Sequence, residues 1–319
     1  MKHKINISSM RISTYLKTAL LAGAGLYFIA SCRMVHPTTT DNFTVNYKTA
    51  DVKHGKALLY SSCGGCHYVD KTGKFSGRQL SDLPKILGKV YSANLTASPE
   101  YSPVPHYSDA ELAYLVRTGI KRDGHFVPYM LRPNMSDQDL KDLIAYLRSG
   151  DEPVAASSAT AGHTKLNFLG KLVINGRKPM PYETNIPNPT NPIDKGRYLV
   201  DNIGCFHCHS KKITSVNYLH PEESRGYLSG GAKFKIPGVG TVRGSNITIG
   251  KETGIGFFTE EDFRNAVQHA KAPNGSKLRP PMEAFHLTNE EADAIYAYIN
   301  TLPPKEHKVK GQVQVGVVH

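Results

Sequence analysis

The stretch Cys63-Gly64-Gly65-Cys66-His67 decides the fold, and it recurs once in the chain as Cys205-Phe206-His207-Cys208-His209. Two thiols one helical turn apart can bond both vinyl groups of one porphyrin, while the adjacent imidazole reaches the iron. Each C-x-x-C-H motif, called a clamp below, therefore predicts one covalently bound haem c. We expect two haems in the chain, attached through Cys63, Cys66, Cys205 and Cys208, with His67 and His209 as iron ligands.

A zinc site and a thiol-redox pair are the alternative interpretations of these cysteines. A zinc site needs four ligands folded closely together. The two cysteine pairs instead lie 142 positions apart (205 − 63), and a histidine follows each of them. A redox pair does not require that histidine, so the doubled motif favours haem.

Length and composition agree with two haem-binding units. A chain of 319 residues is long enough for two domains, and the doubled motif favours two over one. Its hydrophobic fraction of 39% is lowish for a globular protein. A buried haem is itself a large apolar core element, so fewer core side chains suffice.

The N-terminus has the features of an export signal. Basic residues precede an apolar run over residues 18–30, whose 13 residues are too few to span a bilayer as a helix. The run ends in Ile29-Ala30-Ser31-Cys32, which resembles a bacterial lipoprotein box, and Cys32 is the only cysteine outside the clamps. We therefore expect residues 1–31 to be a signal peptide and Cys32 to be lipidated. An ordinary signal peptide with a stray cysteine and an uncleaved anchor are the alternatives.

This signal predicts a lipid-anchored membrane protein of the bacterial cell envelope that faces the periplasm. Removing the signal lowers the formal charge from +12 to +8, with 35 basic against 27 acidic residues. A modest basic excess can steer docking to an acidic partner or to anionic lipid. No nucleic-acid-binding module accompanies it, so we expect no nucleic acid partner.

The two halves of the chain follow one plan. Seven residue pairs recur at a common offset of 152, whereas the clamps differ by 142, so the second copy carries ten extra residues after its clamp. A match of Ser76-Gly77 to Ser229-Gly230 places most of this insert within residues 211–228. The seven pairs are Gly88/Gly240, Asn94/Asn246, Pro128/Pro280, Met130/Met282, Ser136/Thr288, Leu143/Ile295 and Tyr146/Tyr298.

This repeat sets the expected domain boundaries. We expect a tether over 32–46, a first domain over 47–150, a proline-rich linker over 151–190, a second domain over 191–305 and a tail over 306–319. A first helix should cover residues 50–60 and lead into the clamp. Four further helix starts read as capping boxes, in which a hydroxyl and an acid three residues later satisfy backbone donors reciprocally. They begin at Ser108, Ser136, Thr259 and Thr288.

A low-spin electron-transfer haem needs a second axial ligand, and methionine raises the potential relative to histidine. Met130 and Met282 each follow a proline-containing stretch and precede a helix cap by six residues, so we predict them as the distal ligands. Met135 aligns with Leu287 and should be core, whereas Met180 should pack in the linker. The histidine alternatives share no common offset, and His207 is interpreted as a solvent-facing spacer. Those histidines are His106, His125, His269 and His286.

Beyond the clamps, the sequence resembles the cytochrome c subunits of membrane-bound alcohol, aldehyde and gluconate dehydrogenases. The resemblance lies in Ile236-Pro237-Gly238-Val239-Gly240-Thr241, Ser245-Asn246-Ile247-Thr248 and Glu252-Thr253-Gly254-Ile255-Gly256, and more loosely in Asn94-Leu95-Thr96. It covers both domains but not the tail, and it implies a mainly α fold of two tandem class I cytochrome c domains. Those subunits typically carry three haems, whereas this chain has two clamps.

Together these features predict a di-haem electron carrier between a dehydrogenase or quinol enzyme and a terminal acceptor. Its partners would be redox proteins: a dehydrogenase subunit, a terminal oxidase or a soluble cytochrome. The alternative is an enzyme such as a di-haem peroxidase or a thiosulfate-oxidising cytochrome. Such enzymes need an opening iron or a free thiol beside it, which the His/Met ligand set and the cysteine count do not favour.

Overall fold

The computed structural model describes residues 17, 35–38, 43–81, 83–236 and 238–310. The expected lipidation site Cys32, and nearly all of the expected signal, lie outside these residues. Within the described residues, no helix has the length and hydropathy needed to cross a membrane.

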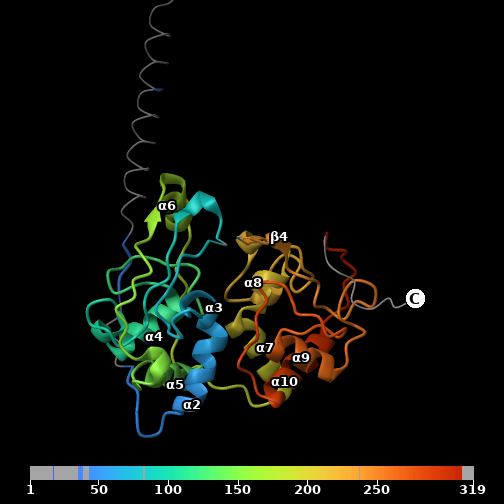
Figure 1. The fold of residues 1–319 in the computed structure, drawn as a ribbon, viewed down its shortest axis with the longest axis horizontal. Helices are drawn as coiled ribbons and strands as arrows, with labels where there is room; N and C mark the ends of the chain where they lie inside the picture. Colours follow the sequence, from blue (N-terminus) through green and yellow to red (C-terminus); the bar gives the residue numbers. More distant parts are fainter. Residues whose placement is uncertain (1–16, 18–34, 39–42, 82, 237, 311–319) are drawn as a thin grey trace, which may run out of the picture.

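The described chain is mostly helical, as predicted, with only short strands (Figure 1). The strands form two antiparallel pairs, β1 (Gly88–Lys89) with β2 (Lys165–Leu166) and β3 (Lys233–Ile236) with β4 (Gly240–Arg243). The α-helices are α2 (Val52–Leu58), α3 (Gly64–His67), α4 (Asp109–Thr118), α5 (Asp137–Leu147), α6 (Phe168–Asn175), α7 (Pro192–Ile203), α8 (Cys205–His209), α9 (Glu260–His269) and α10 (Asn289–Thr301).

Helix α2 packs against α5 in the first half of the chain, and the contact is close enough to require glycine. A Cβ added to Gly55 would lie 2.0 Å from the carbonyl oxygen of Asp142, inside van der Waals contact. Side chains around this crossing form a buried cluster that includes Leu59, Phe75 and Tyr146. The predicted first helix is present, but it passes at Leu59–Cys63 into a π-helical turn that leads into the clamp.

The second half repeats this crossing with α7 and α10 (Figure 1). A Cβ on Gly196 would lie 1.9 Å from the carbonyl oxygen of Ala294, the residue 152 positions after Asp142. A separate buried cluster surrounds the contact and includes Val200, Phe206 and Ile299. Two apolar cores, each beside one clamp, follow from this repetition.

Three of the four predicted capping boxes are present, at Ser108, Thr259 and Thr288. At Ser136 the prediction is only half correct. The serine hydroxyl accepts from the Asp139 N–H, but the Asp139 carboxylate does not reach back to the cap. It accepts instead from His54 Nε2 at 3.1 Å and from the Tyr198 hydroxyl at 2.6 Å.

Residues 151–190, expected as a linker, pack against the first unit. Their strand β2 pairs with β1, and Ile174 of α6 is buried in a third cluster with Leu87 and Val90. Residues 306–310, expected as part of a tail, hold to the second unit, where Glu306 accepts from Thr253 and Val309 is buried.

Candidate haem sites

A short helix carries each clamp histidine: α3 follows the π-helical turn that ends at Cys63, and α8 begins at Cys205. In the first clamp Cys66 is exposed, Cys63 is half-buried and His67 is buried at 6% exposure. In the second, both cysteines and His209 are half-buried. Two thiols and an imidazole are thus presented within one helical segment, the arrangement that covalent haem attachment requires.

Both clamp histidines are held in the same way. His67 Nδ1 lies 2.8 Å from the carbonyl oxygen of Ala93, and His209 Nδ1 lies 2.8 Å from that of Ser245. A carbonyl only accepts, so each Nδ1 carries the proton and each Nε2 keeps a lone pair for a metal. Burial lowers the pKa of both imidazoles, which also favours the neutral, ligating form.

The loops that supply these carbonyls are pinned by two equivalent asparagines. Asn94 accepts from the Thr96 N–H at 2.8 Å, and Asn246 accepts from the Thr248 N–H at 3.0 Å. Both residues are at least 96% buried, and each side chain also donates to a distant backbone carbonyl. The repeat had identified the Asn94/Asn246 pair, but not that it orients the clamp histidines.

The predicted methionines occupy matching turns. The Met130 N–H donates to the Val127 carbonyl at 3.2 Å, and the Met282 N–H donates to the Arg279 carbonyl at 3.1 Å. Both side chains are half-buried, and Met282 packs against the second core. Met135 is buried in the first core at 1% exposure, as predicted for a packing residue, and Met180 packs against the third cluster.

The alternative histidines are engaged elsewhere or lie on the surface. His106 Nε2 is 2.8 Å from the Pro99 carbonyl, His125 pairs with Asp123, and His269 is exposed at the end of α9. His286 stacks on Tyr60 with ring centroids 4.3 Å apart.

The interpretation of His207 as a solvent-facing spacer is wrong. Its ring packs on Phe206 and on Tyr218, with centroids 4.3 and 5.1 Å away, and its buried Nε2 has no hydrogen-bond partner in the described chain. Burial lowers its pKa to about 3. Tyr218 lies within residues 211–228, where most of the insert falls, so the contact depends on a fold that the clamp motif alone does not encode.

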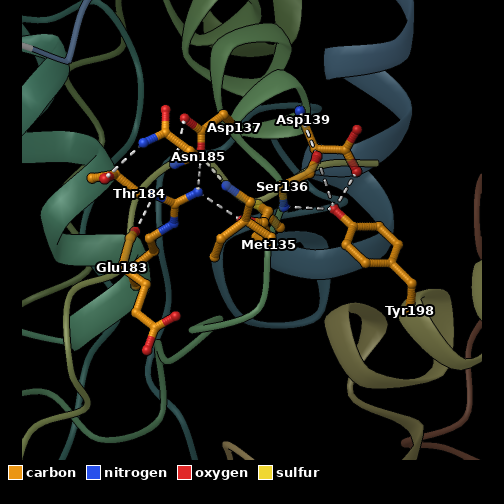
Figure 2. A network of polar contacts seen from close by, with 10 residues as sticks. Met135, Ser136, Asp137, Asp139, Glu183, Thr184, Asn185 and Tyr198 are labelled. Atoms are coloured by element: carbon orange, nitrogen blue, oxygen red, sulfur yellow. Dashed lines mark hydrogen bonds and ion pairs between the residues drawn. The ribbon is translucent and has the colours of Figure 1, made fainter. Parts of the chain in front are cut away.

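The two units meet at the segments that follow the two predicted methionines in the chain. In Figure 2 the Tyr198 hydroxyl of α7 points at Ser136 and Asp139, and the Ser136 N–H donates to it at 3.0 Å. From the second unit, the His286 N–H donates to the Ser61 hydroxyl of the first unit at 3.0 Å. The segment after Met130 therefore contacts the second unit, and the segment after Met282 contacts the first unit.

A basic cavity of about 330 Å³ lies beside the second clamp. Its wall contains six lysine and arginine side chains, one histidine and no acidic residue. Within the described chain, none of these six cations forms an ion pair. They are Lys211, Lys212, Arg225, Arg243, Lys308 and Lys310.

Proteins with similar sequences are cytochromes c or cytochrome subunits of dehydrogenases. Residues 52–151 match the family model for cytochrome c. The chain is 28% identical to the fructose dehydrogenase cytochrome subunit of Gluconobacter japonicus, over 77% of this chain and 51% of that one. It is 27% identical to the gluconate 2-dehydrogenase cytochrome c subunit of Pantoea cypripedii, over 80% of this chain and 60% of that one.

A third relative is the cytochrome c subunit of the quinone-dependent alcohol dehydrogenase of Gluconacetobacter polyoxogenes, 26% identical over 76% of this chain and 53% of that one. The chain thus spans between half and three fifths of the length of these relatives. These matches confirm the resemblance inferred from the sequence.

Proposed function

We propose that this chain is a di-haem c-type cytochrome with two tandem class I domains, and that it relays single electrons. The observation that carries the proposal is the repeated clamp geometry. In both units a clamp imidazole donates from Nδ1 to a loop carbonyl at 2.8 Å, and the two loops are 152 positions apart. The family model covers only the first unit, so the proposal for the second rests on this equivalence.

The residues present fit a haem at each clamp. Cys63 and Cys66, or Cys205 and Cys208, would hold it covalently, while His67 or His209 would ligate the iron through Nε2. Met130 and Met282 would each supply a second protein ligand to an iron. When bound, haem supplies reversible one-electron iron chemistry. A carrier of this kind has no open coordination position for a substrate.

The relatives' names indicate the class of partner. They are cytochrome subunits of fructose, gluconate and alcohol dehydrogenases. We infer that this chain receives electrons from a dehydrogenase subunit or quinol enzyme and passes them to a terminal oxidase or soluble cytochrome. The six cations of the basic cavity, which form no ion pair within the described residues, support docking to an acidic protein surface near the second clamp.

An electron-counting experiment distinguishes an electron carrier from a haem enzyme. Fully oxidised protein should take up two electrons per chain, show low-spin spectra at both haems when reduced, and fail to bind carbon monoxide. The reason is that two His/Met-ligated irons are coordinatively saturated. Carbon monoxide binding by the wild type, or turnover of peroxide, would favour a di-haem enzyme instead.

For location, we propose export and lipid anchoring through Cys32, because this cysteine ends a short apolar run. Cys32→Ser should release the protein from the membrane into the soluble periplasmic fraction. Ser31→Ala keeps a small residue before the cysteine and should leave the protein membrane-bound. Fractionation followed by haem staining measures both. Mature Cys32→Ser protein that stays in the membrane would exclude the lipid anchor.

A further inference from the structure

Arg132 lies between the two clamps and contacts the backbone before each of them. Its Nη2 donates to the carbonyl of Ser62, the residue preceding Cys63, at 3.0 Å. Its Nε donates to the carbonyl of Asn202, three residues before Cys205, at 2.5 Å. The third donor, Nη1, bonds the Leu131 carbonyl at 2.8 Å. One planar guanidinium thus ties together both clamp segments, a geometry that a lysine cannot reproduce.

The charge of this guanidinium is not neutralised by a neighbour. All three of its hydrogen bonds go to carbonyl oxygens, and within the described residues no carboxylate lies at ion-pair distance. The side chain is half-buried, so water screens the charge only in part. A partly dry, unpaired cation exerts a field over several ångströms.

That field reaches both units. Burial raises the pKa of the Cys63 thiol to about 11 and that of Cys205 to about 12, and in both cases the Arg132 charge opposes the rise. The second unit offers no matching cation, because the residue 152 positions after Arg132 is Ala284. One side chain therefore serves two clamps.

Arg132 also belongs to a segment that ligates a haem under the proposed function, since it follows Met130 by two residues. The same segment continues to Asn134, whose amide donates to the Leu219 carbonyl of the insert at 3.1 Å. The hydrogen bonds from Arg132 to the backbone before each clamp therefore hold the two clamps at a fixed spacing. They also hold this segment in place.

We propose that Arg132 is the positioning residue of the junction, that it sets the distance between the two haems, and that its charge raises the reduction potential of both. This inference rests on the proposed di-haem function. Reduction removes one positive charge from an iron, so a nearby fixed cation favours the reduced state at each site. A single residue then keeps the two potentials high together.

The test is an equilibrium redox titration of the purified di-haem protein, followed by optical spectroscopy, with two variants. Arg132→Gln removes the charge and should lower the reduction equilibrium constant of both haems by about threefold or more, which is roughly 30 mV at 59 mV per tenfold change. Arg132→Lys keeps the charge and should hold both potentials near the wild-type values. Lysine lacks the several donors of the planar guanidinium, so the distance between the oxidised haems should vary more. Pulsed electron paramagnetic resonance should show this as a broader distance distribution.

Arg148→Gln is the matched control, since this partly buried arginine pairs with Asp109 and contacts neither clamp. It should move neither potential. Unchanged potentials in Arg132→Gln would overturn the electrostatic role, and a shift at one haem alone would overturn the shared role. An Arg132→Lys distance distribution as narrow as the wild type would overturn the positioning role. A wild-type chain with fewer than two haems would instead refute the proposed function.

Discussion

Replacing Met282 with alanine is expected to open the iron of the second haem and to lower its reduction potential. The thioether is a neutral, polarisable ligand that favours the reduced state, and no other methionine lies in the second unit. The reduced variant should therefore become high-spin at one haem and bind one carbon monoxide per chain. Optical spectra with and without carbon monoxide measure both effects.

Met130→Ala should produce the same change at the first haem, and Met135→Ala is the control for both variants. Met135 is 1% exposed in the first core, so its truncation should cost on the order of 2 to 5 kcal/mol of unfolding free energy and leave both haem spectra unchanged. A carbon monoxide complex that forms in Met135→Ala but not in Met130→Ala would show that Met135, and not Met130, is the ligand of the first haem.

The double change Cys205→Ser and Cys208→Ser should leave the chain with one covalent haem in place of two. A hydroxyl does not form the thioether, so the second haem is extracted when the denatured protein is treated with acidic acetone. The same extraction of wild-type protein should remove neither haem. Haem content per chain, measured on denatured protein, separates these outcomes.

The second core should also loosen in this variant, because a haem bound at the second clamp would add to the apolar cluster that includes Phe206 and Met282. The equivalent change at Cys63 and Cys66 is the matched control and should remove the first haem alone. Two haems retained after acid-acetone treatment of the Cys205/Cys208 variant would refute attachment at the second clamp.

Local patterns predicted the parts of this molecule that depend on near neighbours in sequence. The capping boxes at Ser108, Thr259 and Thr288 need only a hydroxyl, an acid and a helix, and all three formed. The buried position of Met135 followed from its alignment with Leu287. The mainly α fold and the resemblance to dehydrogenase cytochrome subunits were likewise visible in the motifs.

Contacts between distant segments escaped prediction. The Asp139 carboxylate accepts from the hydroxyl of Tyr198, 59 residues away, and not from its own helix cap. His207 is covered by Tyr218 of an insert whose conformation no short pattern encodes. Arg132 carries no motif at all, and its role follows only from the meeting of two units at the Ser62 and Asn202 carbonyls.

The two glycine crossings suggest a second signature for chains of this kind. Gly55 stands eight positions before the first cysteine of its clamp, and Gly196 stands nine positions before Cys205. Any side chain at either site would collide with a backbone carbonyl of the packed helix, so the restriction is steric and independent of the haem. An unfamiliar genome could therefore be searched for a C-x-x-C-H motif preceded at this spacing by glycine, and the paired pattern would reject the many chance occurrences of the clamp alone.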